Sequence, residues 1–557
     1  MKKNIIYLAA LAMLTVACSN EDDTILPGSE TGSTDEVKMI TETITATNGD
    51  AAGSASTRAE VADNAMFTWS ANDHVAAHLS TGEYTVGNTG SGGSNSAEFS
   101  VSYPEGASRD AFAVFPSTIV IRNAANYGQS GASLDVTLPK KYDVTEVKDH
   151  ITPCPMIADN TGSFWTFKQL CGLLRLTITN IPSGTDYLKL DFNGRKVSGD
   201  FSIASPVTPG TSTIQSVAGT KGTDDYIMIT GLGDVTSYTV NIPLPTGTAY
   251  SGLIVSAWDD NNTTDNLSDD KPLKAQVTPF SYNATRAKGK KVTSALSLGV
   301  FSIASGKYAV FAPGNLQYNK STGTWSFMDN QYDMAETANQ NVGTDYASQN
   351  IVSLFGWGTK TKPYNTTTVN NYDQSASYDV DYSWNEWGDN VIGGYAAGTW
   401  RTLTGGSGAE WAYLLNTDGS SGRSDSYRFQ RATVTASDGT TTIAGLLIFP
   451  DGYTTQVTGD NTGLNQTGDG YPFTQKTYSN AEWLTLESNG VVFLPAAGYR
   501  NGTTVSDVGS YGYYWSSTIS ENTSAAIYVS FSSTTLAAAS AIYRDNGCSV
   551  RLVHPVE

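Results

Sequence analysis

Apolar and polar residues alternate along much of the segment from residue 67 to residue 297. In residues 173–181, Leu174, Leu176 and Ile178 share one face of an extended chain, and the residues between them are Arg and Thr. A period of two residues is the pattern of a half-buried β-strand. Further strands are predicted at residues 187–192, 226–229, 238–244 and 253–258. The segment is therefore expected to fold as β-sheets.

Two polar runs mark turns between these strands. Asn193-Gly194 follows the strand at residues 187–192, and Asn-Gly is a strong signal for a β-hairpin turn. Residues 259–262, Asp-Asp-Asn-Asn, follow the apolar run at residues 253–258. Carboxylates can bind calcium, but this run lacks the spaced ligands and the glycine of an EF-hand loop. A solvated hairpin tip is the favoured interpretation.

The pattern changes near residue 297, where a second globular unit is expected to begin with the apolar run at residues 301–311. Two helix starts are predicted there, because Ser407 and Ser479 are each followed three residues later by Glu. This spacing is that of a capping box, and Trp and Leu residues follow on one face in both cases. The second helix is expected to end at Gly490. Short helices among many short strands indicate an α+β fold.

The stretch from Phe493 to Val553 has two apolar ends, LPAAGYRNG and GCSVRLV. Between them, short apolar and aromatic runs around residues 513–515 and 527–531 can supply a β core. Ser, Asn, Thr and Gly separate these runs and suit exposed loops or strand ends. A rigid frame that displays changeable polar and aromatic residues is typical of a recognition surface.

Bulk properties exclude several classes of protein. A length of 557 residues accommodates about three or four domains. The 33 basic and 53 acidic residues give a formal net charge of −20, which argues against nucleic-acid binding because that depends on clustered Lys and Arg. Four cysteines without a CxxC pair give neither a disulfide framework nor a zinc-knuckle signal. Cys154 and Cys171 either pair in an oxidising compartment or leave Cys171 as a buried core thiol.

The N-terminus has the pattern of an export signal. Residues 1–17 contain two lysines, an apolar run and small residues, and the run is too short to span a membrane. Cys18 follows directly, as in a bacterial lipobox, and becomes the lipidated first residue in that interpretation. Residues 18–59 form a polar tether with one β-like run at residues 37–47. Arg58 near its end is either a site for a trypsin-like protease or an ordinary linker arginine.

The middle of the chain resembles the Bacteroidetes fimbrillin-like proteins. The resemblance rests on FTWSANDHVAAHL, AFAVFP, VSGDFSI and the run at residues 155–182. It implies two tandem transthyretin-like β-sandwiches, at residues 60–182 and 183–297. It also implies an outer-membrane lipoprotein, lipidated at Cys18 and exposed on the cell surface. Cleavage after Arg58 would leave Ala59 as the new N-terminus and remove the strand at residues 37–47. Another fimbrial subunit would then donate a β-strand to the open groove.

Residues 300–557 resemble the C-type-lectin-like domains of Bacteroidetes surface proteins, a fold shared with formylglycine-generating enzymes and with retroelement-diversified variable proteins. APGNLQY, LFGWG, WRTLT, FLPAAGYRNG, GYYWSS and SVRLV carry this resemblance. The chain departs from calcium-dependent lectins, because it has no EPN or QPD triplet. It departs from the enzymes because Cys548 alone cannot supply their chemistry. In the diversified members the varying positions lie in the last strands and loops, corresponding here to residues 506–546.

The resemblance therefore nominates twelve ligand-binding residues, among which Tyr, Trp and Arg are the expected anchors. For Trp515 and Tyr513 a core role in the GYYWSS frame is an equal alternative. The nominated residues are Ser506, Ser510, Tyr511, Tyr513, Trp515, Ser517, Ile519, Asn522, Tyr528, Ser530, Tyr543 and Arg544.

Catalysis is not expected, because no recognisable nucleophile or metal motif surrounds any of the four scattered histidines. We expect no cofactor and no bound metal. The leading hypothesis is a fimbrial tip adhesin that binds a host or microbial glycan or protein. After Val553 only four residues remain, which leaves no spare strand to donate to a further subunit. The alternative is a monomeric cell-surface lipoprotein that binds a glycan or protein while staying tethered through Cys18.

Overall fold

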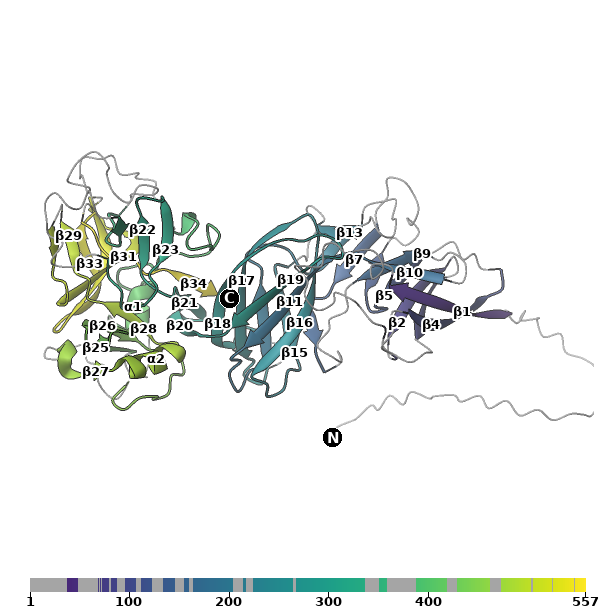
Figure 1. Ribbon diagram of the computed structural model, residues 1–557, viewed down its shortest axis with the longest axis horizontal. Helices are drawn as coiled ribbons and strands as arrows, with labels where there is room; N and C mark the ends of the chain where they lie inside the picture. The colour runs from purple at the N-terminus through teal and green to yellow at the C-terminus, as the bar shows by residue number, and fades with distance from the viewer. Residues whose placement is uncertain are drawn as a thin grey trace, which may run out of the picture.

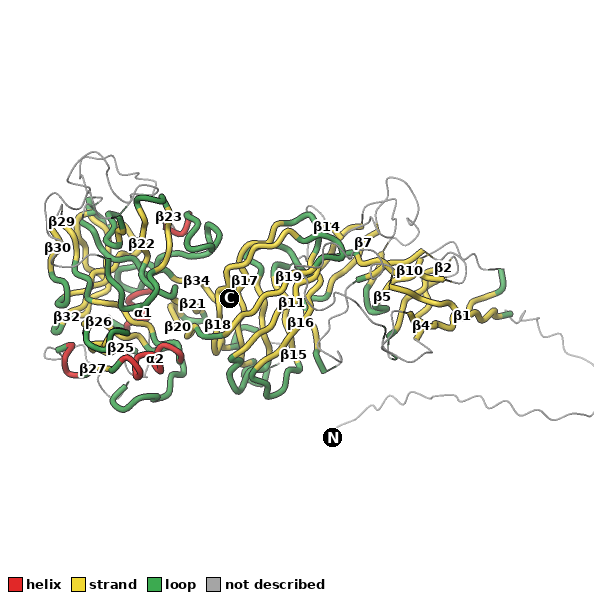
Figure 2. The backbone as a smooth tube through the Cα atoms, viewed as in Figure 1, coloured by secondary structure: helices red, strands yellow, loops and turns green. Residues whose placement is uncertain are grey.

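The computed structural model has three β-rich bodies in a row along its longest axis (Figure 1). β1 (Met39–Asn48) lies at one end of this axis, and β29 (Tyr499–Asn501) and β33 (Leu536–Tyr543) lie at the other. Among the described residues, strands dominate throughout, and the short helices lie in the C-terminal body (Figure 2). The structure describes residues 38–48, 69, 71, 73–79, 82–87, 96–106, 112–122, 134–145, 155–159, 164–203, 214–216, 224–263, 267–335, 350–357, 387–417, 428–460, 472–501, 504–522, 524–544 and 546–557.

The first body is built on a seven-stranded sheet of order β3-β2-β5-β9-β10-β1-β4. Its edge strands β3 and β4 lie in contact, so the sheet curls around its own core. Trp69 fills that core and meets the rings of Phe99, Phe115 and Phe167 edge-on at 5.2–5.3 Å. Besides β1, the strands are β2 (His74–Leu79), β3 (Gly82–Gly87), β4 (Ser96–Pro104), β5 (Phe112–Phe115), β9 (Met156–Asp159) and β10 (Phe164–Gln169).

A four-stranded sheet of order β14-β13-β7-β6 packs on the outer side of this first sheet. Phe112 and Val114 of β5 meet Val136 of β7 and Phe201 of β13 in a second apolar cluster. Residues 199–203 thus pair with residues 134–138, across the expected domain boundary at residue 182. The four strands are β6 (Val120–Arg122), β7 (Leu134–Leu138), β13 (Gly199–Ile203) and β14 (Ile214–Ser216).

The middle body packs a three-stranded sheet, β16-β11-β19, against part of an eight-stranded sheet. The predicted alternation in β11 (Gly172–Thr179) is confirmed, because Leu174, Leu176 and Ile178 are fully buried in the core between the two sheets. β11 pairs with both β16 (Ser237–Leu244) and β19 (Gly289–Ala295). Strand pairing therefore crosses residue 182 here as well.

The eight-stranded sheet continues from the middle body into the C-terminal body. Its order is β34-β21-β20-β18-β17-β12-β15-β8, and β18 joins β20 through the pairs Lys274↔Gly299 and Ala275↔Leu298. One apolar cluster includes Trp258 and Val277 of the middle body together with Val310 and Trp400. The strands are β8 (Lys141–Asp143), β12 (Tyr187–Asp191), β15 (Tyr226–Thr230), β17 (Ala249–Asp259), β18 (Lys271–Asn283), β20 (Leu298–Ala304), β21 (Lys307–Phe311) and β34 (Val553–Val556).

The rest of the C-terminal body consists of small sheets and short helices, in agreement with the expected α+β mixture. The sheets have the orders β23-β22-β24, β27-β25-β26-β28, β29-β30 and β31-β32-β33. Their elements, with the helices, are β22 (Leu316–Asn319), β23 (Thr324–Phe327), β24 (Ile351–Val352), β25 (Phe429–Thr435), β26 (Thr442–Ile448), β27 (Thr477–Tyr478), β28 (Val492–Pro495), β30 (Thr504–Ser506), β31 (Tyr511–Ile519), β32 (Ala525–Ser532), η6 (Trp387–Asp389), η7 (Phe473–Gln475), α1 (Glu410–Leu415) and α2 (Asn480–Ser488).

One of the two predicted capping boxes is confirmed and the other is wrong. At α2, the Ser479 hydroxyl accepts the Glu482 amide at 3.3 Å, and the Glu482 carboxylate accepts the Ser479 amide at 2.8 Å. Gly490, with φ of 83°, follows the end of this helix as expected. The first helix, α1, instead begins at Glu410, and its N-cap Ala409 makes no side-chain cap. There the Glu410 carboxylate binds Arg401 and is not available to close a capping box.

The predicted turn at Asn193-Gly194 forms, but the hairpin does not. Both residues have the positive φ angles, 53° and 76°, that such a turn requires. However, β12 pairs with β15 and β17, and β13 pairs with β7 and β14. The two strands flanking the turn thus enter different sheets.

Several predicted positions lie outside the described residues. These include the signal peptide, Cys18, the processing site Arg58 and Ala59, and Cys154. The possible Cys154–Cys171 pair therefore stays a prediction, while Cys171 and Cys548 are both buried. Within the described ranges, no helix combines the length and apolarity needed to cross a membrane. The transthyretin-like and lectin-like assignments of the domains also stay predictions.

Candidate functional site

The first candidate site is the place of β1 inside the seven-stranded sheet. β1 lies between two strands, antiparallel to β4 over nine residue pairs and parallel to β10 over four. The β-like run predicted at residues 37–47 is therefore confirmed as a strand over its described part. β1 supplies hydrogen-bonding partners to both neighbours, so neither β4 nor β10 has an open edge on that side.

Side chains of β1 also complete the core of the first body. Ile44 and Ala46 are buried, with 2% and 0% of their surface exposed, and Ile40 packs against the same cluster. Thr41 and Thr43, on the opposite face, are exposed. The alternation therefore places these apolar side chains on one face of β1, packed in the same cluster as Trp69, Phe99 and Trp165.

The second candidate site is a group of four half-buried tyrosines, which we call the tyrosine surface: Tyr499, Tyr511, Tyr513 and Tyr528. Tyr513 lies at its centre, with ring centroids 5.1 Å from Tyr499, 5.8 Å from Tyr511 and 5.6 Å from Tyr528. The strands β29, β31 and β32 carry these residues. Tyrosines of this kind offer flat apolar faces and hydroxyl groups at little cost in conformational entropy.

The hydroxyl groups of Tyr513 and Tyr528 remain protonated at neutral pH. Burial raises the pKa of Tyr513, and the neighbouring Asp507 carboxylate raises it further. The Tyr513 hydroxyl donates a hydrogen bond of 3.1 Å to Asp507 Oδ2. Burial also raises the pKa of Tyr528. The one proton of the Tyr513 hydroxyl is thus given to Asp507, and its oxygen can still accept a hydrogen bond from a ligand.

The structure brings some of the twelve nominated residues together. Ser510 is exposed in the turn that starts at Asp507 and leads into Tyr511, and Ser506 pairs with Tyr499 across the β29–β30 hairpin. At the other end of the sheet, Tyr543 is 53% exposed and pairs with Ala525, close to the exposed Asn522. Ser517 and Ile519, towards the end of β31, are half-buried.

Three nominated residues are buried instead. Trp515 has no exposed surface, and its indole N–H donates to the Phe355 carbonyl at 2.6 Å, so it takes the core role that was the alternative for it. Arg544 is 3% exposed, with its guanidinium 5.6 Å from the centre of the Trp357 ring. Ser530 is 9% exposed. These side chains support the surface and do not form it.

Sequence reasoning missed Tyr499, which belongs to the tyrosine surface, and Asp507, which accepts the hydrogen bond of the Tyr513 hydroxyl. Tyr499 lies in the segment GYRNG, which was treated as part of the frame. The Asn501-Gly502 dipeptide in that segment is a hairpin signal, and a hairpin there folds Ser506 back against Tyr499. That signal could have placed Tyr499 beside the nominated residues.

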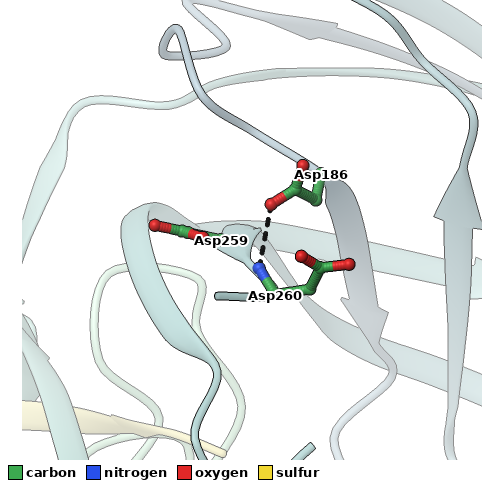
Figure 3. Close-up of side chains that lie close together, drawn as sticks. All are labelled: Asp186, Asp259 and Asp260. Atoms are coloured by element: carbon green, nitrogen blue, oxygen red, sulfur yellow. Dashed lines mark hydrogen bonds between the residues drawn. The ribbon is translucent and has the colours of Figure 1, made fainter. Parts of the chain in front are cut away.

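Three carboxylates from two loops meet at the tip of the β17–β18 connection (Figure 3). One ligand oxygen each of Asp186, Asp259 and Asp260 lies within 4.8 Å of the others. Asp186 Oδ2 accepts the Asp260 amide at 2.9 Å, and Asp259 Oδ1 accepts the Asn261 amide at 2.8 Å. These bonds make the carboxylates caps of the turn, consistent with the predicted hairpin tip. No other group of potential metal ligands is found among the described residues.

Comparisons with known proteins give one family match and several weak structural matches. A family model described as a domain of unknown function, DUF8237, matches residues 468–553, the stretch that contains α2 and the tyrosine surface. No curated protein matches the chain.

The structural matches are to adhesion and fimbrial proteins. A candidate cell adhesion protein from Bacteroides uniformis ATCC 8492 is 17% identical, with a TM-score of 0.22, over 43% of this chain and 98% of that chain. The tip fimbrial protein from Porphyromonas gingivalis with a C-terminal truncation is 11% identical, with a TM-score of 0.17, over 42% and 82%. A fimbrial assembly protein from Parabacteroides distasonis ATCC 8503 is 10% identical, with a TM-score of 0.17, over 49% and 95%. At these TM-scores the likeness does not establish a common fold.

Proposed function

We propose that this protein is a surface fimbrial subunit that acts as a tip adhesin. In this proposal, a strand from another subunit replaces β1 and anchors the protein in the fimbria. The tyrosine surface then binds a host or microbial glycan or protein. The observation that carries the proposal is the position of β1 between β4 and β10.

Loss of β1 would create an acceptor groove for an extended strand. β4 and β10 would each expose a row of unpaired backbone groups, which is the template that strand addition requires. The positions now filled by Ile44 and Ala46 would become pockets two residues apart. An incoming strand with an apolar residue at every second position would hydrogen-bond to the backbones of β4 and β10 and place its apolar side chains in these pockets.

A single cleavage between β1 and the rest of the chain would allow this exchange. β1 ends at Asn48, and Arg58 lies ten residues further on in the sequence. Cleavage after Arg58 would leave β1 attached to the lipidated Cys18 segment and start the mature subunit at Ala59. After that step β1 is held in the sheet by hydrogen bonds and packing alone, so a competing strand can displace it.

The placement of the tyrosine surface fits a role at the outer end of a fibre. β1 lies at one end of the long axis, and β29 and β33 lie at the opposite end (Figure 1). A subunit held through the β1 groove would thus present the tyrosine surface away from the fibre. Residues 553–556 are already paired with β21 as β34, so they would have to leave this sheet to serve as a donor strand.

Immunogold electron microscopy of intact cells tests the proposal, with an antibody against residues 300–557. Gold confined to fibre ends is the expected result. An Arg58→Ala strain provides the matched control, because it should carry the protein on the cell body and leave the fibre ends unlabelled. Gold spread over the cell body in both strains would contradict the proposal and favour the alternative, a tethered monomeric lipoprotein.

A further inference from the structure

A cavity of about 760 Å³ lies where the middle body meets the C-terminal body. Its walls come from the turn after β12, the tip of the β17–β18 connection, the turn between β20 and β21, residues 398–401 and β34. None of the tyrosine surface lines it. The volume falls within the range of about 300–1,000 Å³ that small-molecule sites occupy.

Three buried polar groups that line this cavity have no hydrogen-bond partner among the described residues. They are Asp270 Oδ1, Thr399 Oγ1 and Trp400 Nε1. The three residues are 4%, 1% and 1% exposed. An unpaired buried polar group is costly, and each such group calls for a partner that the described residues do not supply.

A hydrogen bond to one carboxylate oxygen of Asp270, Oδ2, fixes the position of this side chain. Asp270 Oδ2 accepts a hydrogen bond of 2.6 Å from the Tyr187 hydroxyl. Tyr187 in turn stacks on Trp258, with ring centroids 6.0 Å apart. The second oxygen, Oδ1, is therefore held in place by a buried aromatic pair while its own bonding capacity is unused.

The three groups require a partner that both donates and accepts hydrogen bonds. The Asp270 carboxylate oxygen only accepts, the Trp400 indole N–H only donates, and the Thr399 hydroxyl can do either. A cationic amine would satisfy Asp270 and leave Trp400 unpaired. Hydroxyl groups combine both capacities, so a ligand that carries several of them can satisfy all three groups.

The charges around the cavity disfavour an anion. Arg401 and Glu410 form a two-bond ion pair at 2.6 and 2.8 Å, so each cancels the other. Asp191 and Asp270 also line the cavity. Lys189, whose charge acts on Asp191, does not line it, and Lys307, which does, is exposed. An incoming carboxylate or phosphate would face these two carboxylates at close range.

Aromatic rings supply the apolar part of the cavity wall. Trp258, Tyr308 and Trp400 all line it, and the rings of Trp258 and Tyr308 meet edge-on at 6.5 Å. Such rings pack well against the C–H faces of a sugar while hydroxyl groups bond at its rim. We propose that this junction cavity binds a neutral polyhydroxylated ligand of about one or two sugar rings. Water alone is the competing occupant, because it too donates and accepts.

Isothermal titration calorimetry on the purified full chain tests this site. The probes are methyl β-D-glucopyranoside, N-acetylglucosamine and lactose, with choline and glucuronate as cationic and anionic comparisons. The variants Asp270→Asn and Trp400→Phe remove one unpaired group each. Trp411→Phe is the matched control, because Trp411 is equally buried and its Nε1 also lacks a partner among the described residues, but it does not line the cavity.

Saturable binding of at least one neutral sugar is expected, weakened about tenfold by Asp270→Asn and by Trp400→Phe and unchanged by Trp411→Phe. Circular dichroism confirms that each variant is folded. Asp270 and Trp400 line the cavity and are not part of the tyrosine surface. Sugar binding at the tyrosine surface would therefore not respond to Asp270→Asn or Trp400→Phe, which separates the cavity from the adhesin proposal. The inference is overturned if no neutral sugar binds, if choline or glucuronate binds more tightly, or if the two cavity variants bind as well as the parent chain.

Discussion

Gly498 shows how the tyrosine surface depends on a single backbone position. It lies directly before Tyr499 with φ of 67°, and a Cβ there would lie 1.9 Å from the Ser506 carbonyl oxygen. Gly498→Ala therefore adds a clash with backbone to left-handed strain. We expect it to lower the free energy of unfolding by at least about 3 kcal/mol.

Gly509→Ala is the matched control for this prediction. Gly509 has a φ of 78°, but a Cβ there would have no atom within 4 Å. Gly509→Ala should lower the free energy of unfolding by about 1 kcal/mol, from the left-handed conformation alone. Guanidinium unfolding of the full chain measures the free energy of unfolding of both variants. Equal costs would show that the contact with Ser506 does not constrain the hairpin.

The Arg401–Glu410 pair predicts a pH-dependent stability. Burial acts to raise the pKa of Glu410, but hydrogen bonds and charge from Arg401 outweigh it and hold the pKa below its ordinary value. A carboxyl with a depressed folded pKa stabilises the fold above its ordinary pKa and loses that effect as the pH falls through the folded value. Both side chains are less than one fifth exposed, at 14% and 17%.

Arg401→Met should therefore cost about 3 kcal/mol at pH 7, because it leaves a largely buried carboxylate without its cation. The cost should shrink as Glu410 becomes protonated in acid. Guanidinium unfolding at a series of pH values measures this difference. Lys38→Met serves for comparison, because its ion pair with Glu105 is mostly exposed and should matter little at any pH. A cost for Arg401→Met that does not change with pH would rule out the charge as its source.

Residue roles on the nominated surface could be predicted only in part. The sequence indicates that aromatic residues gather in residues 511–528, but it does not indicate which face of a strand meets a neighbour from elsewhere. Trp515 and Tyr513 share one face of β31, yet Trp515 is covered by Phe355 from a distant segment and Tyr513 is not. Such covering contacts depend on tertiary packing, which local alternation does not encode.

At the scale of single elements, β1 completes the core of the first body and is also the strand that the proposed exchange would replace. Ile44→Asp should weaken the hold of β1 in its sheet, because it buries a carboxylate among Trp69, Phe99 and Trp165. Hydrogen exchange should then rise in β4 and β10, the two partners of β1. Thr43→Asp, on the exposed face of the same strand, should leave exchange unchanged. Unchanged exchange in Ile44→Asp would show that β1 does not close this part of the sheet.

Element types were easier to predict than element partners. Period-two alternation identified β11 and a capping box identified α2, because both signals are contained within about ten residues. The pairing of β1 with β10, more than 110 residues later in the chain, left no local signal. The capping box predicted for α1 was wrong for a related reason, because Glu410 forms an ion pair with Arg401, which lies outside the helix.

At the scale of the whole molecule, the composition shift near residue 297 does not mark a break in the sheet. β18 and β20 lie on either side of this shift and are paired in the eight-stranded sheet. The apolar cluster around Trp258 and Trp400 also spans the two bodies. A shift in composition therefore marks where the fold class changes, while strand pairing and side-chain packing still couple the middle body to the C-terminal body.

This coupling predicts that the middle and C-terminal bodies lose stability together. Ala275 is fully buried in β18 and pairs with Leu298 of β20, so Ala275→Asp places an unpaired carboxylate inside the shared cluster. Hydrogen exchange should rise both in β11 of the middle body and in β31 of the C-terminal body, and β4 in the first body should change little. Ala295→Asp, at an exposed position of β19, should affect none of these strands. A rise confined to one body would show that the junction bends or opens independently. A rise in both bodies would mean that the middle body and the C-terminal body behave as one rigid unit. A subunit anchored through the β1 groove, as proposed, would then hold the tyrosine surface in a fixed orientation relative to its middle body.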